Sequence, residues 1–304
     1  MRISTNTIYH NGISKINTLQ AEQSKLQQQI STGKRISVPS DDPIAAAHAL
    51  EISHAQEANA SFANTRQTAQ LKLNTLESSL GSITELLVSA QSTLVGAGNG
   101  VLTNLERGFI ATELSGSLEQ LIGLANTKDA SGDFVYAGFK TDTKPFVASA
   151  TGANYAGDSN QQLLQVDSQR LMAVNAAGDS VFQASGNDVF TTLSNLVTLL
   201  NTPITNATEQ AAFSAGVATA ISNLNGSVDN VLNVRAAVGS KLNELDSLNS
   251  AGSDRDLQYS KSLSDLQDLD YASALSDLAK QQTIMQAAQK SFVETTRLSL
   301  FQFI

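Results

Sequence analysis

The sequence predicts a mainly α-helical protein, in which both chain ends form a long coiled-coil-like helical bundle and a small antiparallel β domain is inserted between them. Three observations support this fold class. Apolar residues recur alternately every three and four positions over long stretches on both sides of the middle. The middle carries short apolar runs separated by Gly and Asn/Asp clusters, which are strand and turn signals. The four prolines lie outside the long periodic stretches.

The first long helix is predicted over residues 44–95. Its apolar positions form a heptad seam, the stripe along which a coiled-coil helix meets its partner. Ser40-Asp41-Asp42-Pro43 is a start signal, because a short acidic side chain caps free N–H groups and Pro fits the first helical position. The glycine-rich run 96–100 is a stop signal, and a second helix is expected over 102–128. The principal seam residues are Ile52, Phe62, Leu73, Leu76, Leu80, Ile83 and Leu87.

The second half of the chain repeats this pattern. A third helix carries a seam from Val217 onward, and we expect it to end at Ala251-Gly252-Ser253. A fourth helix is expected from there to the C-terminus. The seam residues of the third helix are Val228, Val231, Val238, Leu242 and Leu245, and those of the fourth are Leu275, Leu278, Met285 and Phe292. A weaker seam over the first thirty-odd residues is diluted by Gly and Gln.

Strand signals in the middle are Phe134–Ala137, 162–167 and 170–174, and a helix over 189–200 returns the chain to the bundle. We therefore divide the chain into five parts. They are an N-terminal segment disordered in the monomer and helical in the assembly (1–43), the first half of the bundle (44–131), the β domain (132–188), the second half of the bundle (189–253) and a C-terminal assembly helix (254–304). Because the turns and strands of the β domain are local in sequence, we expect that it can be removed without affecting the seams.

Composition excludes several classes of function. The chain of 304 residues has a net charge of −9, which argues against a general nucleic-acid binder. It has no Cys, which excludes thiolate metal sites and cysteine nucleophiles. No apolar run is long enough for a transmembrane helix, so we expect no membrane insertion. The N-terminus lacks the apolar core of a secretory signal peptide, which by ordinary rules predicts a cytoplasmic protein.

No motif supports an active site, a cofactor or a metal. Thr32-Gly33-Lys34-Arg35 lacks the first glycine and the final Ser or Thr of a phosphate-binding loop. His48, Glu51 and His54 are spaced too widely for two histidines on one ion, and we interpret them as a solvated helix face. Asp265, Asp268 and Asp270 do not follow the pattern of a calcium loop and are interpreted as an exposed acidic helical turn. Asn59 and Arg66 interrupt the first seam and are interpreted as residues that set its register.

Several motifs resemble the hook–filament junction proteins of the bacterial flagellin family. At the N-terminus these are Met1-Arg2-Ile3-Ser4-Thr5, Ser31-Thr32-Gly33-Lys34-Arg35-Ile36 and Pro39-Ser40-Asp41-Asp42-Pro43-Ile44-Ala45-Ala46. At the C-terminus they are Leu269-Asp270-Tyr271-Ala272-Ser273-Ala274, Gln281-Gln282 and Leu298-Ser299-Leu300-Phe301. The middle resembles the family more loosely, through Phe134-Val135-Tyr136-Ala137-Gly138, Pro145-Phe146 and Tyr155-Ala156-Gly157-Asp158.

The resemblance implies a structural subunit without enzymatic activity, exported unfolded by the flagellar type III pathway, which uses no cleaved signal. It implies that the terminal helices pack in the core of a tubular extracellular structure. The implied partners are hook-associated protein 1, flagellin, further copies of the chain in a ring and a cytoplasmic export chaperone at the C-terminal helix. Three alternatives remain open: a minor flagellin or filament subunit, a secreted helical translocator and, from another class, an enzyme.

Overall fold

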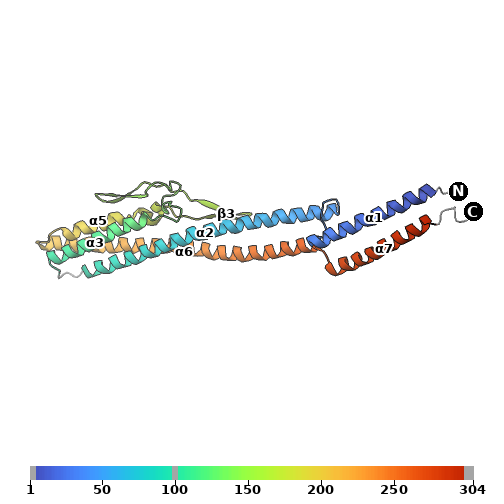
Figure 1. The fold of residues 1–304 in the computed structure, drawn as a ribbon. Helices are drawn as coiled ribbons and strands as arrows, with labels where there is room; N and C mark the ends of the chain where they lie inside the picture. The colour runs from blue at the N-terminus through green and yellow to red at the C-terminus, as the bar shows by residue number, and fades with distance from the viewer. Residues whose placement is uncertain (1–4, 98–101, 298–304) are drawn as a thin grey trace, which may run out of the picture. The chain divides into compact units, whose positions relative to one another are not determined.

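The computed structural model describes residues 5–97 and 102–297, and the chain divides into two compact units, residues 1–59 with 254–304 and residues 60–253. Figure 1 labels the longer helices and strand β3. The helices are α1 (Thr5–Thr32), α2 (Pro43–Ala97), α3 (Asn104–Ala125), α4 (Gly178–Phe182), η1 (Ala184–Gly186), α5 (Val189–Asn201), α6 (Ala207–Gln267) and α7 (Tyr271–Arg297). The strands are β1 (Phe146–Ser149), β2 (Gly152–Tyr155), β3 (Leu163–Asp167) and β4 (Arg170–Ala173). The predicted fold class is confirmed.

Helix α2 begins where the start signal places it. The Asp42 side chain accepts the backbone N–H of Ala45 at 3.1 Å, and Pro43 occupies the first helical position. The helix ends at Ala97. Gly98, Asn99 and Gly100 of the expected stop signal lie outside the described residues.

In the unit of residues 60–253, α2 and α6 run side by side in opposite directions. Polar pairs along their length fix this register: Gln91 with Asn225, Glu77 with Arg235 at 2.7 Å and Arg66 with Asn249 at 2.7 Å. Between these pairs the two seams meet in a continuous buried core. The apolar faces of α2 and α6 are thus buried within this unit, in one shared core.

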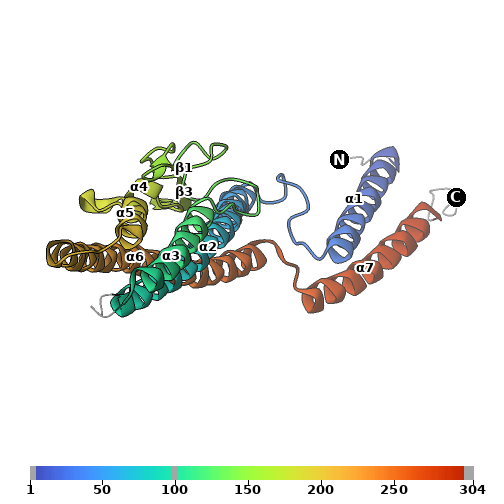
Figure 2. The same cartoon turned by 90° about the vertical axis from the view of Figure 1, so that its left-hand side faces the viewer.

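Two shorter helices complete this core. A capping box starts α3, because the Thr103 hydroxyl accepts the N–H of Glu106 while the Glu106 carboxylate accepts the N–H of Thr103. Asp188 caps α5 by accepting the N–H groups of Phe190 and Thr191. Helices α3 and α5 lie side by side, as Figure 2 shows.

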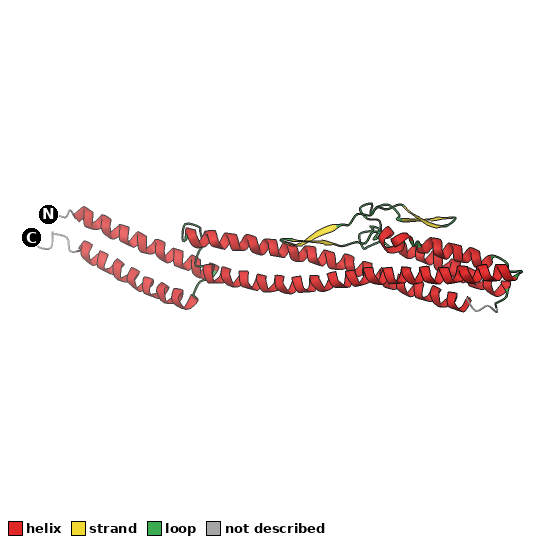
Figure 3. Ribbon diagram, turned by 180° about the vertical axis from the view of Figure 1, so that it is seen from behind, coloured by secondary structure: helices red, strands yellow, loops and turns green. Residues whose placement is uncertain are grey.

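The segment between α3 and α5, which we call the insert, contains two separate antiparallel hairpins, β1–β2 and β3–β4. Their strands are yellow in Figure 3. The predicted strands over 162–167 and 170–174 are confirmed as β3 and β4. The predicted strand at Phe134–Ala137 is wrong, because this segment forms one isolated bridge, Phe134 to Lys128, followed by turns. The β1–β2 hairpin was not predicted. Its turn ends at Gly152, whose φ of 126° and close approach to the Phe190 backbone exclude a side chain.

The expectation that the insert is separable from the helices is wrong. Its aromatic residues Tyr136, Phe146 and Phe182 belong to the same buried core as the α2 and α6 seams. The Tyr136 hydroxyl bonds to Ser79 of α2 at 3.0 Å, and the buried Arg66 guanidinium donates to the Val166 carbonyl at 3.1 Å. The strand and turn signals of the insert are local in sequence. The insert nevertheless buries its side chains against helices that are distant in sequence.

We therefore expect deletion of residues 135–185 with a short Gly/Ser bridge to destabilise the helices. The deletion removes Phe146 and Phe182 from contact with Phe190 of α5, and loss of one buried large aromatic side chain costs about 3–5 kcal/mol. Thermal unfolding followed by circular dichroism should show a midpoint many degrees lower. Phe139→Ala, at an exposed position of the insert, is the control and should leave the midpoint unchanged. An unchanged midpoint for the deletion variant would contradict this prediction and would mean that the insert is separable from the helices.

The expected helix end at Ala251-Gly252-Ser253 is also wrong, because α6 continues to Gln267. Gly252 is buried within the helix and does not interrupt it. The chain leaves the helix fifteen residues later, between α6 and α7. The expected helix over 189–200 is confirmed as α5.

Candidate assembly surfaces

Helices α1 and α7 form an antiparallel pair in the unit of residues 1–59 and 254–304. At one end, the Tyr9 and Phe292 rings lie 5.4 Å apart between centroids. Gly12 lies under Phe292, and a Cβ atom on this glycine would overlap the ring. Further along, Gln281 donates to Glu22 at 3.0 Å. The weak N-terminal seam therefore has a definite partner in the C-terminal helix.

This pair buries little apolar surface. Among its described residues, α1 has none that is buried, and α7 buries Ala274 and Met285. Leu278 and Phe292 are half-buried, as the predicted seam requires, but Leu275 is 54% exposed and does not belong to the buried row. Other large apolar side chains exposed on the two helices are Ile8, Tyr9, Tyr271, Ile284 and Val293. A helix pair with so thin a core is marginal without further partners.

We expect limited proteolysis of the purified monomer to trim about 30 or more residues from each end while a core resists. The reason is the shallow burial of α1 and α7 compared with the continuous core of residues 60–253. Mass spectrometry of the fragments checks this result. A chain cut inside residues 60–253 before its ends would contradict it.

The connections α1–α2 and α6–α7 bind each other in a structure that we call the clasp, residues 33–42 with 266–271. The Arg35 N–H donates to the Gln267 carbonyl at 2.6 Å, and the Leu269 N–H donates to the Gly33 carbonyl at 2.9 Å. Lys34 and Asp268 form the antiparallel bridge between these bonds. Gly33 has a φ of 70°, and a Cβ atom there would lie 2.9 Å from the Tyr271 hydroxyl oxygen. The clasp therefore joins segments from the two ends of the chain.

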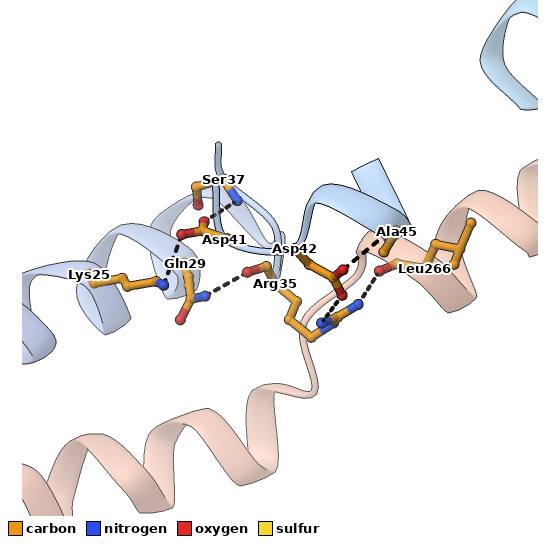
Figure 4. Close-up of polar contacts among 8 residues, drawn as sticks. All are labelled: Lys25, Gln29, Arg35, Ser37, Asp41, Asp42, Ala45 and Leu266. Carbon is orange, nitrogen blue, oxygen red and sulfur yellow. Dashed lines mark hydrogen bonds and ion pairs between the residues drawn. The ribbon is translucent and has the colours of Figure 1, made fainter. Parts of the chain in front are cut away.

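Charged side chains complete the clasp (Figure 4). The Arg35 guanidinium donates to the Leu266 carbonyl at 2.8 Å, at the C-terminal end of α6, and lies 3.4 Å from the Asp42 carboxylate. Lys25 of α1 pairs with Asp41 at 2.8 Å, and Asp41 also accepts the N–H groups of Ser37 and Val38. Arg35 thus links the end of α6 to the start of α2, and Lys25 links α1 to the loop that connects α1 to α2.

These contacts lower the pKa of both carboxyl groups below their ordinary value of 3.8. For Asp41 the largest cause is the hydrogen bond from Lys25, followed by the Val38 N–H. For Asp42 it is the N–H of Ala45, with a further contribution from Arg35. Both groups are ionised at neutral pH, where the clasp is fully formed.

The clasp is expected to loosen in acid. A depressed pKa in the folded state gives stability that is present above the unfolded value and lost as pH falls through the folded value, here below 3.8. NMR titration of the Ser37 and Val38 amide signals should therefore show a transition below pH 3.8. Lys25→Ala should move that transition toward the ordinary aspartate pKa. A transition at the ordinary value in the unchanged protein would contradict the pairing of Asp41 with Lys25.

The structure places the predicted seam residues of α2 and α6 inside the protein. Ile52 and Phe62 are half-buried, as are Val228 and Leu242. The others are buried in the core of residues 60–253: Leu73, Leu76, Leu80, Ile83, Leu87, Val231, Val238 and Leu245. They pack within one copy of the chain, and a part for them in assembly stays a prediction. The clasp was missed, although the Gly33-Lys34-Arg35 loop and the Asp268–Asp270 run were both noted.

The polar clusters behave as solvated surface. His48 and His54 are exposed, each within 3.7 Å of a glutamate on the same helix. Asp265 lies in α6, whereas Asp268 belongs to the clasp and Asp270 caps α7 by accepting the N–H of Ala272 at 3.0 Å. The expected single acidic helical turn is therefore wrong. In residues 5–97 and 102–297, no cluster of three His, Asp or Glu residues could hold a metal ion. Nor is any described helix long and apolar enough to cross a membrane.

Comparison with known proteins assigns the family. Residues 3–141 match the bacterial flagellin N-terminal helical region. Over 99% of both chains, the sequence is 38% identical to flagellar hook-associated protein 3 of Escherichia coli K12 and 39% identical to that of Salmonella typhimurium LT2. The chain belongs to the flagellar hook-associated protein 3 family. The resemblance seen at the chain ends is thereby confirmed and extends over the full length.

Solved structures agree with this membership. A flagellar hook-associated protein from Vibrio parahaemolyticus superposes with a TM-score of 0.69 at 25% identity, covering 75% of this chain and 100% of that one. A flagellar junction protein from Legionella pneumophila shares the fold, with a TM-score of 0.64 at 20% identity over 73% of this chain and 100% of its own. Hook-associated protein 3 is a structural component of the extracellular flagellum and not an enzyme, and this holds for the present chain.

Proposed function

We propose that the chain joins the hook to the filament, with hook-associated protein 1 on the hook side and flagellin on the filament side. A ring of its own copies would form the junction. It would be exported by the flagellar type III pathway without a cleaved signal, after binding a cytoplasmic export chaperone through its C-terminal helix. The full-length similarity to hook-associated protein 3 supports this role.

The observation that carries the proposal is the contrast between the two units. Residues 60–253 bury their seams in their own core. The α1–α7 pair buries few residues and leaves apolar side chains such as Leu275 and Ile284 exposed. Exposed apolar surface on a helix pair favours burial against neighbouring molecules. The terminal pair is therefore the part that we expect to be completed by partners, as a tubular assembly requires.

Electron microscopy of a deletion strain tests the function. Loss of a junction protein should leave hooks without filaments and release flagellin into the medium. Filaments on the deletion strain would instead support the alternative, a minor flagellin. Antibody labelling between hook and filament on wild-type cells provides the positional check.

A further inference from the structure

The thin packing of α1 against α7 does not by itself account for the pairing of these two helices. No described residue of α1 is buried, so the contact removes little apolar surface from water. Midway along the pair, Gln281 donates to Glu22, but its side-chain oxygen Oε1 is enclosed and accepts no hydrogen bond from a described residue. An enclosed acceptor without a donor opposes pairing. Another part of the same unit must therefore help to hold the two helices together.

The clasp is attached directly to the ends of both helices. Gly33 follows the last residue of α1, and its positive φ ends that helix, with its N–H on the Gln29 carbonyl at 2.9 Å. The Gln29 side chain also donates to the Arg35 carbonyl at 2.6 Å, which ties the last turn of α1 to the clasp (Figure 4). Asp270, the residue before α7, accepts the N–H of Ala272 at 3.0 Å. The clasp therefore fixes where α1 ends and where α7 begins.

The helix pair continues the register of the clasp. Glu22 meets Gln281 midway along the pair, and Gly12 lies under Phe292 at the far end. Counted from the clasp, nearly equal numbers of residues along α1 and along α7 lead to each of these two contacts. Fixing one end of the pair therefore places the remaining side chains opposite their partners. It also removes the cost of bringing two separate helices together, because the pairing becomes an event within one joined unit.

We propose that the clasp is a latch on the terminal helices: α1 and α7 are paired while it is closed and separate when it opens. Closing it holds the helices together in register, which compensates for the apolar core that their own surfaces do not supply. Opening it leaves helices of 28 and 27 residues with little buried surface, and such helices are marginal in water. The latch is a property of a single copy, so it is tested separately from the proposed junction role.

A disulfide at the far end of the pair reports whether the helices are together, because the chain itself has no cysteine. The reporter is Gly12→Cys/Phe292→Cys. A Cβ at position 12 lies 3.6 Å from Cγ of Phe292, whose place the cysteine sulfur takes, so the two thiols are within disulfide reach. The clasp lies about 30 Å away along α1. The rate of disulfide formation in dilute monomer, divided by the rate in urea-unfolded protein, measures the pairing.

Arg35→Ala opens the clasp from its side-chain contacts. It removes the guanidinium that bonds to the Leu266 carbonyl and lies near Asp42, and it should lower this rate ratio about fivefold or more. The matched control is Lys34→Ala. It removes the same charge from the neighbouring residue, whose side chain is exposed and forms no ion pair with a described residue. The control should leave the ratio unchanged within about twofold.

Gly33→Val opens the clasp through the backbone and keeps Arg35 in place. A β-branched residue is strained at a φ of 70°, and its Cβ would lie 2.9 Å from the Tyr271 hydroxyl oxygen, so the ratio should again fall. Both substitutions lie outside residues 60–253, and the urea midpoint of that core should not change. A ratio unchanged by both clasp variants, or lowered equally by Lys34→Ala, would show that α1 and α7 pair through their own packing and would overturn the latch.

Discussion

Cells whose only copy carries Leu278→Asp are expected to export the protein at near-normal levels, grow no filaments and release flagellin into the medium. Leu278 is half-buried on the row of α7 that contains Ala274 and Met285 and that faces α1. Full burial of one leucine contributes about 1.5–3 kcal/mol, and an aspartate at the half-buried Leu278 loses a part of this and places a carboxylate between the two helices. In a ring of subunits the loss is repeated at every copy. Motility assays and flagellin immunoblots of the medium measure the result.

Two control variants on the same helix make this result specific. Glu294→Ala changes an exposed side chain and should leave filaments normal. Leu275→Asp should leave the α1–α7 pair intact, because Leu275 points away from α1, and it reports on contacts with neighbouring molecules alone. Normal filaments with Leu278→Asp would mean that the row is no assembly surface. Loss of secretion would instead place its role in export or chaperone binding.

The position of Leu275 shows where sequence periodicity reaches its limit. The row that faces α1 contains Ala274, Leu278, Gln281 and Met285, spaced by four, three and four residues. Choosing the most apolar residue near each position selects Leu275 in place of Ala274 and rotates the start of the row by about 100°. Where a seam is diluted by Ala and Gln, hydrophobicity alone does not fix which face is buried. In α2, where leucines occupy the seam, the same reasoning was confirmed.

The clasp was beyond sequence reasoning for a different reason. Its central bonds join backbone groups of Gly33 and Arg35 to those of Leu269 and Gln267, more than 230 residues away. Backbone groups are present in every residue and carry no sequence signal. The insert was misjudged similarly, because its strand signals are local while its contacts, such as Tyr136 with Ser79, are not. Local patterns predicted these elements, and long-range packing decided what they contact.

The seam of α2 predicts a large difference between two leucines on one helix. Leu80 is fully buried in the core of residues 60–253, whereas Leu71 is 63% exposed. Leu80→Ala should lower the free energy of unfolding of residues 60–253 by about 2–5 kcal/mol, because it removes buried methyl groups and leaves a cavity. Leu71→Ala should change it by less than about 0.5 kcal/mol. The two substitutions remove the same atoms, so helix propensity contributes equally to both.

Urea unfolding of the purified protein measures this difference. Near-ultraviolet circular dichroism, which sums the signals of the five tyrosines, follows this unfolding, and the buried Tyr136, which bonds to Ser79 next to Leu80, is the contribution from this core. The midpoint should fall for Leu80→Ala with an unchanged urea dependence, which shows that stability and not compactness has changed. Equal midpoints for the two variants would mean that the α2 seam does not carry the stability of residues 60–253. The proposed type III route takes the chain unfolded, so we expect Leu80→Ala to be secreted normally, and stability and secretion can be measured separately for this variant.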